Sequence, residues 1–393
     1  MSLVIDAAAC LPEDGEAGCL VGRAWVPGRH AGPSVVVVED GEVFDVSAAA
    51  PTVADLLEAE APVELLRAAE RTEPLGPLDA LLANSPHEGR DEIRPRMLAP
   101  CDLQALKACG VTFVESLLER VIEERAEGDP GKAQDIRRAL AATVGADIGT
   151  VKPGSAAAER LKAALIDRGL WSQYLEVGIG PYAEVFTKAQ PMSAVGPCSE
   201  VGLHPDSVWN NPEPEMVLVV DPRGRTVGAT LGNDVNLRDF EGRSALLLGR
   251  AKDNNASCAI GPFIRLFDDS FTLDDARRAD IRLVIEGAAG YRLEATSSMR
   301  EISRDLEDLV AQTINETHQY PDGLLLFTGT MFVPVQDREA PGEGFTHKTG
   351  DIVRISSEKL GCLVNRVDRS DRLARWNFGA RALMRSLAGR GLL

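Results

Sequence analysis

The sequence predicts an α+β protein, in which a smaller N-terminal α+β domain over residues 1–96 precedes a larger domain over residues 97–393. Three observations support this class. A hairpin pattern lies near the N-terminus, helical periodicity follows residue 113, and short strand-like runs separated by turn residues continue from Tyr182 to the end. A chain of 393 residues is long enough for two domains that each bury a core.

The N-terminal region contains a strong hairpin signal. Residues 34–46 read SVVVVEDGEVFDV, in which a β-branched run reaches an Asp-Gly pair and a second alternating run follows. The short amphipathic pieces VADLLEA and VELLRAAE come next, before the proline-bearing segment RDEIRPRMLAP. Because such a segment is typical of a linker, we place the domain boundary there.

Helices are expected directly after this boundary. Over residues 114–125 apolar side chains recur at the three-four spacing of a helix, with glutamates on the other side. A second helix should end near residue 142, and a third should span 155–168 before Gly169. The remainder is predicted to be mostly β, with one helix around 301–317.

Composition narrows the partners and the compartment. The net charge of −18, from 42 Lys+Arg against 60 Asp+Glu, argues against nucleic acid and anionic membranes as partners. The seven cysteines form no CxxC pair, the N-terminus does not resemble a signal peptide, and the longest apolar stretch, 323–335, is too short to span a bilayer. We expect a cytoplasmic protein with reduced thiols.

A cluster of carboxylates is predicted in the segment 209–243. Here the runs MVLVV and TVGATL are joined by Asp-Pro-Arg-Gly, a composition that favours a tight turn. In a hairpin centred on that turn, Val220 lies near residue 225 or 226, and Glu213 and Glu215 lie opposite residues 230–233. Asp234 then falls one or two residues past the partner of Glu213. Three carboxylates should therefore converge at one end of the hairpin.

Three anions this close repel one another, so protons or a cation must neutralise them. Oxygen ligands without nearby His or Cys favour a hard ion, Mg²⁺ or Mn²⁺. The alternative is that Glu213 and Glu215 form the solvent-exposed face of an ordinary strand.

Several motifs in order resemble the fumarylacetoacetate hydrolase superfamily. They are PEPEMVLVV, GNDVNLRDFEG and AKDNNASCAIGPF, followed by DGLLLFTGT, KTGDIVRI and GCLVNRV, with VFTKAQPMSAVGP before them. The resemblance covers roughly residues 97–367 and implies a mixed β-roll catalytic domain that assembles as a homodimer or homotetramer. It also implies that Glu213, Glu215 and Asp234 hold the metal.

Two departures from the hydrolases bear on the reaction. The first lies in their pattern GxNYxxHxxE, and the second at a glutamine that follows their NDxxxRD motif. The matching stretch GVTFVESLLE carries Ser116 where the hydrolases have histidine, so that only Glu119 of the water-activating pair remains. Glu241 stands where the hydrolases place the glutamine. A carboxyl group transfers protons and an amide does not, so these exchanges favour elimination over hydrolysis. Within the superfamily the chain looks most like the bacterial 2-keto-3-deoxy-pentonate dehydratases.

The resemblance also gives roles to the remaining candidates. Lys252 is predicted as the base and Glu241 as the acid, with an exchange of the two roles left open, and Glu119 is the next catalytic candidate. Substrate contacts are predicted for Lys188, Ser116 and Thr330. Without the resemblance, Lys252 could be a surface lysine and Thr330 an ordinary strand residue. The polar stretch 336–349 is either a lid or a plain loop.

The predicted function is metal-dependent dehydration of a small 2-keto acid. A 2-keto-3-deoxy-pentonate, derived from D-xylonate or D-arabinonate, would give 2-oxoglutarate semialdehyde (2,5-dioxopentanoate). The alternatives are an acylpyruvate or fumarylpyruvate-type hydrolase, an oxaloacetate decarboxylase using the same metal site, and a ligand-binding protein without activity.

Overall fold

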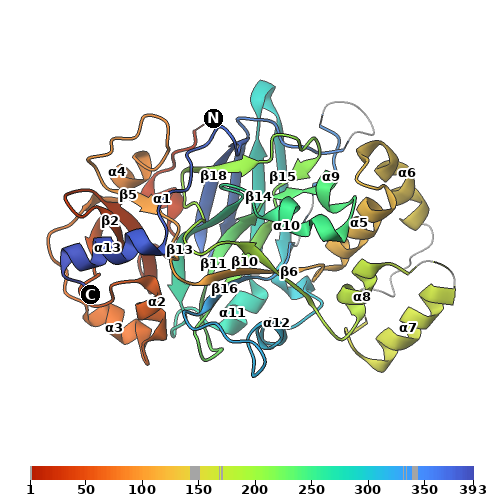
Figure 1. Ribbon diagram of the computed structural model, residues 1–393, viewed down its shortest axis with the longest axis horizontal. Coiled ribbons are helices and arrows are strands. Elements are labelled where there is room, and N and C mark those ends of the chain that lie inside the picture. Colours follow the sequence, from red (N-terminus) through yellow and green to blue (C-terminus); the bar gives the residue numbers. More distant parts are fainter. Residues whose placement is uncertain are drawn as a thin grey trace.

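The computed structural model describes residues 2–141, 151–167, 169, 171–330, 332, 334–338 and 344–393. An 11-stranded sheet runs through the molecule (Figure 1). Its strands follow in the spatial order β4 (Gly76–Pro77), β3 (Glu42–Asp45), β2 (Gly32–Glu39), β1 (Leu20–Val26), β13 (Cys258–Leu266), β11 (Thr226–Asp234), β10 (Pro214–Val220), β16 (Leu324–Phe327), β6 (Ala105–Gly110) and β7 (Glu184–Ala189), with β5 (Arg96–Leu98) beside β1.

A second sheet of five strands has the order β15 (Arg292–Ser298), β14 (Asp280–Glu286), β17 (Ile352–Ser357), β18 (Gly361–Arg369) and β8 (Ser199–Leu203). A small ladder joins β9 (Asn210–Asn211) to β12 (Asn236–Leu237). Most strand pairs are antiparallel, but β16 pairs with β6, and β18 with β8, in parallel. The predicted α+β class with a mixed sheet is confirmed.

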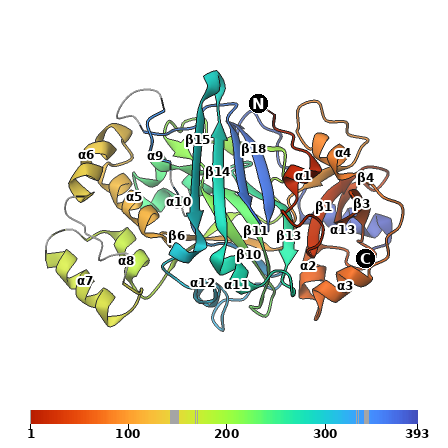
Figure 2. The same ribbon diagram turned by 180° about the vertical axis from the view of Figure 1, so that it is seen from behind.

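The helices gather at the two ends of the sheets (Figures 1 and 2). At one end lie α1 (Ala7–Cys10), α2 (Val53–Glu58), α3 (Pro62–Ala68), α4 (Leu78–Ala83) and the C-terminal α13 (Ala380–Arg390). At the other end lie α5 (Val114–Arg125), α6 (Pro130–Ala141), α7 (Ala156–Asp167) and α8 (Gln173–Ile179). The remaining α-helices among the described residues are α9 (Arg238–Glu241), α10 (Leu248–Lys252), α11 (Leu273–Arg278) and α12 (Leu306–Thr313).

Strand β10 is buried on both faces. Met216 and Leu218 belong to the core between the two sheets, whereas Val217 and Val219 belong to the core on the opposite face of the large sheet. Each fully buried aliphatic side chain contributes about 1.5–3 kcal/mol of burial free energy. The strand that leads to the predicted carboxylates is therefore held firmly from both sides.

Most of the local predictions are confirmed. The hairpin over 34–46 is β2 paired with β3, and the first helix occupies Val114–Arg125 as expected. The predicted end of the second helix, near residue 142, lies outside the described residues. The helix predicted over 301–317 is shorter, Leu306–Thr313, because Asp305 caps its start by accepting the Glu307 N–H at 2.9 Å and Ile314 adopts extended backbone.

The large sheet contains strands from both sides of residue 96. The domain boundary at that residue stays a prediction. Strand β1 pairs with β13, so the N-terminal strands extend the sheet that carries β10 and β11. The C-terminal helix returns to the N-terminal strands, where Arg390 donates to the Ser34 hydroxyl at 2.7 Å and to the Pro33 carbonyl at 2.8 Å. Within the described residues, no helix has the length and apolar character needed to cross a membrane.

Candidate metal centre

The hairpin formed by β10 and β11 turns at Asp221-Pro222-Arg223-Gly224, as predicted. Asp221 accepts the N–H groups of Arg223 and Arg225 at 2.9 Å each, and Gly224 has a φ of 81°, which favours glycine. Val220 pairs with Thr226, within the predicted range.

The position of Asp234 differs from the prediction by one residue. Its N–H donates to the Glu213 carbonyl at 3.0 Å, so Asp234 lies directly opposite Glu213 rather than beyond its partner. The cause is a register shift between Val219 and Val220, where β11 carries one extra residue. This shift brings the two carboxylates closer than counting from the turn had predicted.

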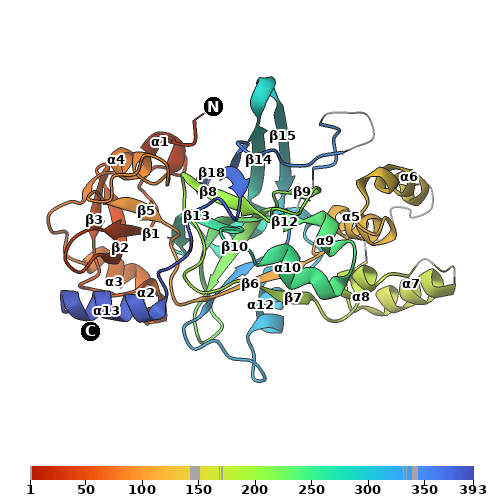
Figure 3. The same cartoon turned by 45° about the horizontal axis from the view of Figure 1, so that its top comes forward.

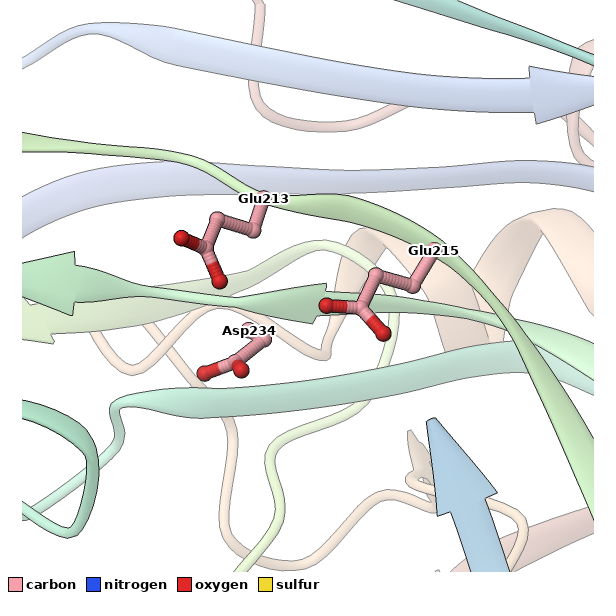
Figure 4. Close-up of side chains that lie close together, drawn as sticks. All are labelled: Glu213, Glu215 and Asp234. Atoms are coloured by element: carbon pink, nitrogen blue, oxygen red, sulfur yellow. The ribbon is translucent and has the colours of Figure 1, made fainter. Parts of the chain in front are cut away.

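The three carboxylates meet in the interior. Figure 4 shows Glu213 and Glu215 on one ribbon and Asp234 on its neighbour, with their carboxyl groups turned toward one another. Each residue offers a ligand atom within 4.8 Å of the others, and their exposed fractions are 2%, 1% and 1%. The alternative that Glu213 and Glu215 form an exposed strand face is therefore wrong.

Cationic side chains surround two of the three carboxylates. Lys252 Nζ lies 2.5 Å from Glu213 and 3.0 Å from Asp234, and Lys188 Nζ lies 2.8 Å from the other oxygen of Asp234. Among the described residues, Glu215 has no ion pair and receives one hydrogen bond, from the Gly329 N–H at 2.7 Å. The cluster is thus incompletely neutralised at Glu215.

This imbalance appears in the pKa values. Burial, together with Asp234 and Glu213, raises the pKa of Glu215 well above its usual range. Burial also acts to raise the pKa of Asp234, but Lys188 and Lys252 outweigh it and lower that pKa. Buried oxygen donors with an unpaired carboxylate suit a hard divalent cation, so the residues present fit the predicted Mg²⁺ or Mn²⁺.

Lys252 lies at the end of α10 with only 2% of its surface exposed, so the surface-lysine alternative is wrong. Burial acts to lower its pKa, but the charges of Asp234, Glu213 and Glu241 outweigh burial and raise it. In this ion-paired arrangement Lys252 is an ammonium group.

Arg120, on α5, is a residue that the sequence analysis missed. Its guanidinium lies 2.5 Å from Glu123, 2.6 Å from Glu213 and 2.8 Å from Glu241. It therefore bridges a carboxylate of the cluster to Glu241, whose pKa is raised to about 7, above all by burial. Its place four residues after Ser116 puts it on the same helix face, a spacing that the sequence offered as a signal.

Ser116 and Glu119 lie on the same helix but are engaged differently. The Ser116 hydroxyl donates to the Phe113 carbonyl at 2.9 Å within its own helix. Glu119 pairs with Arg238 at 2.9 Å, and Arg238 also lies 2.6 Å from Glu123 and 4.3 Å from the Trp209 ring. Arg238 thus connects Glu119 to the same network as Arg120 through Glu123.

The remaining candidates also lie at the cluster. The ammonium of Lys188, fully buried, contacts Asp234, the Val235 carbonyl at 3.2 Å and the Lys252 carbonyl, which leaves no ammonium proton for a substrate in this arrangement. Thr330 follows Gly329, the residue that bonds Glu215, and its hydroxyl donates to the Phe332 carbonyl at 2.9 Å.

Asn236 is a further buried group that the sequence analysis did not single out. It lies two residues after Asp234 and has no exposed surface, and neither side-chain amide atom has a partner among the described residues. A buried amide without partners is rare and is typical of a place where a ligand or water binds. The only signal in the sequence is its position beside Asp234.

The segment that carries the carboxylate cluster is similar to a known protein family. Residues 176–368 match the sequence profile of the family described as Fumarylacetoacetate (FAA) hydrolase C-terminal. The chain is 32% identical over 186 residues to a 2-dehydro-3-deoxy-D-arabinonate dehydratase of Saccharolobus solfataricus, covering 47% of this chain and 59% of that protein. It is 33% identical over 194 residues to a probable 2-keto-3-deoxyxylonate dehydratase of Haloferax volcanii, covering 49% and 63%. The matches thus span about three fifths of those relatives.

Solved structures share the fold over a larger part of the chain. A 2-keto-3-deoxy-D-arabinonate dehydratase complexed with magnesium and 2,5-dioxopentanoate superposes with a TM-score of 0.61 at 21% identity, covering 89% of this chain and 99% of that one. A fumarylacetoacetate hydrolase of Exiguobacterium antarcticum superposes with a TM-score of 0.51 at 18% identity, covering 89% and 99%. The fold predicted from the sequence motifs is confirmed.

Proposed function

We propose that this chain, whose residues 176–368 belong to the fumarylacetoacetate hydrolase C-terminal family, is a metal-dependent hydro-lyase. Its substrate is a 2-keto-3-deoxy-pentonate and its product is 2,5-dioxopentanoate. The observation that carries the proposal is a pair of proton-transfer groups beside the carboxylate cluster. Lys252 forms ion pairs with Glu213 and Asp234. Glu241 is linked to Glu213 because both carboxylates pair with Arg120. The dehydratase names of the relatives at 32% and 33% identity support the same reaction.

The reaction removes one proton and one hydroxide from adjacent carbons. A base takes a proton from C3, beside the keto group, and the resulting enolate expels the C4 oxygen once an acid protonates it. Loss of a C5 proton and tautomerisation then give the aldehyde. The net change is the loss of one water molecule.

Lys252 is the proposed base. Its raised pKa depends on the negative charges of Glu213 and Asp234. Burial by itself lowers the pKa of this amine, so Lys252 would serve as a base once the negative charges of the two carboxylates were offset. Glu213, Glu215 and Asp234 are the residues that would hold a divalent cation, which supplies the positive charge that stabilises an enolate.

Glu241 is the proposed acid. Burial keeps a substantial fraction of its carboxyl groups protonated near pH 7, because its pKa is raised to about 7. The Arg120 guanidinium holds this carboxyl 2.8 Å away while it also holds Glu213 at 2.6 Å. Thr330, Ser116 and Glu119 are proposed to position the substrate, and Lys188 to position Asp234 and Lys252 through its contacts with the Asp234 carboxylate and the Lys252 carbonyl.

A substrate panel tests the reaction class. With Mg²⁺ present, we expect dehydration of 2-keto-3-deoxy-D-pentonate to be the dominant turnover, with 2,5-dioxopentanoate identified by mass. Acylpyruvates and oxaloacetate serve as the competing substrates, because a hydrolase or decarboxylase would use them. The dehydratase proposal is wrong if cleavage of an acylpyruvate is about ten-fold faster or more, which corresponds to about 1.4 kcal/mol in transition-state free energy.

Turnover should also fall as the pH rises through about 7. Below its pKa of about 7, Glu241 carries the proton that the departing oxygen needs, and above that pKa it is a carboxylate. We expect kcat to decline on the alkaline side in the wild type. In Glu241→Gln the residual kcat should not show this decline, since the amide does not titrate. An unchanged alkaline limb in that variant would assign the titration to another group.

A further inference from the structure

A cavity lies away from the carboxylate cluster, where the N-terminal strands meet the segment that leads to α13. Figure 3 shows β1, β5 and α13 together at this end of the molecule. The cavity has a volume of about 440 Å³, within the range of small-molecule pockets. It is lined by the strand residues Trp25 and Arg96, by Arg90, and by the C-terminal residues Trp376 and Phe378.

Two arginines in this cavity have hydrogen-bonding capacity to spare. Arg90 donates to the Ser85 carbonyl, yet its buried Nε has no partner among the described residues. Arg96 has a side chain only 12% exposed, and its Nη1 lies 3.5 Å from Glu92, without a hydrogen bond. Burial, with repulsion from Arg90, lowers the pKa of Arg96 to about 10. Half-buried guanidinium groups with unsatisfied nitrogen atoms favour an anion.

The carboxylates of the cavity satisfy these arginines only in part, because Glu92 pairs with Arg96 at 3.5 Å without a hydrogen bond. Glu92 is 67% exposed at the rim. Glu200 already binds Arg366 at 2.9 Å. Four arginines line the cavity against two glutamates, a local excess of positive charge in a chain with a net charge of −18.

The walls of the cavity are flat and aromatic. The Trp25 ring lies 4.8 Å from the Arg96 guanidinium and meets Phe378 edge-on at 5.0 Å. Trp376 is 47% exposed, a large fraction for a tryptophan, and its indole N–H donates to the Phe378 carbonyl. An aromatic surface beside guanidinium groups is suited to a planar body that carries an oxyanion.

We propose that this cavity binds a small organic anion with a planar apolar body, such as an aromatic carboxylate. Arg90 and Arg96 bind the oxyanion, and Trp25, Trp376 and Phe378 contact the ring. The site is separate from the proposed reaction and does not require the metal.

Phthalate is a suitable probe, because it is a planar ring that carries carboxylates. Its binding can be followed by tryptophan fluorescence, since two of the four tryptophans line the cavity. In metal-free protein, we expect saturable quenching by phthalate. Benzyl alcohol, which has the ring without the charge, and inorganic phosphate, which has the charge without the ring, should both bind at least about ten-fold more weakly.

Two variants and a matched control assign the site. Arg96→Gln should weaken phthalate binding about ten-fold or more by removing a charged donor, and Trp376→Ala should weaken it several-fold without disturbing the fold, because its ring is half exposed. Arg94→Gln is the control, since Arg94 is 74% exposed and pairs with Asp91. The proposal is overturned if quenching does not saturate, if Arg96→Gln and Arg94→Gln bind equally, or if phosphate binds as tightly as phthalate.

Discussion

Glu215→Gln should abolish metal-dependent turnover, with a loss of 10³-fold or more, while the metal-free protein becomes more stable. The amide keeps the shape and the hydrogen bond from Gly329 but removes one of the three proposed metal ligands. The loss follows because charge that stabilises the enolate is no longer held in place. Metal binding by calorimetry and turnover with Mg²⁺ measure the first effect.

The gain in stability follows from the raised pKa of Glu215. The folded state retains this proton to a higher pH than the unfolded state, whose value is near 4.5. Wild-type metal-free protein should therefore lose stability as the pH rises above about 4.5, by about 1.4 kcal/mol for each unit through which only the folded state holds the proton. The glutamine variant lacks the contribution of Glu215 to this loss, and denaturant unfolding of both proteins at two pH values measures the difference.

Glu200→Gln is the matched control. Glu200 is also a buried glutamate, but it lies on β8 and pairs with Arg366 at 2.9 Å, away from the carboxylate cluster. Its substitution should lower stability, because a partly buried ion pair is broken, and leave metal binding and turnover near wild type. A Glu215→Gln protein that binds Mg²⁺ and turns over like the wild type would remove Glu215 from the metal site.

Lys252→Met should abolish both turnover and the exchange of the C3 hydrogens with solvent deuterium, because no base remains beside the substrate. Glu241→Gln should lower turnover by about 10²–10⁴-fold, the range typical of a general acid, while exchange at C3 persists. The contrast arises because enolate formation precedes loss of the C4 oxygen. Deuterium incorporation by NMR and product formation, followed in parallel, separate the two steps.

Lys107→Met controls for the loss of a lysine outside the cluster, on the large sheet that carries the three carboxylates. Lys107 lies on β6 and donates to the Thr187 hydroxyl at 3.0 Å, outside the carboxylate cluster, so both measurements should stay near wild type. If Glu241→Gln loses exchange while Lys252→Met retains it, the acid and base roles are reversed. If neither variant slows turnover, the catalytic groups lie elsewhere and Glu119 is the next residue to test.

Local features of the fold and of the cluster were accessible from the sequence. The hairpin that carries Glu213, Glu215 and Asp234 depends on a turn of four residues and on strand alternation, both of which act over short distances along the chain. The error of one residue at Asp234 came from an extra residue in β11, which the alternation of apolar residues does not reveal.

Contacts between distant segments required the tertiary structure. Arg120 reaches Glu213 across 93 residues of sequence, and Arg238 reaches Glu123 across 115. The cavity at the N-terminal strands likewise joins Trp25 and Arg96 to Trp376 and Phe378.

The sequence by itself determined which three carboxylates form the cluster and that Lys252 lies near them. It could do so because the hairpin turn, the strand alternation and the family motifs each occupy a short segment of the chain. The tertiary structure decided how these charges are balanced. Burial raises the pKa of Glu215 and Glu241, whereas the ion pairs with Lys188 and Lys252 lower that of Asp234. These effects depend on which groups surround each carboxyl in space, and packing of the helical end against the sheet, not local periodicity, brings Arg120 to them.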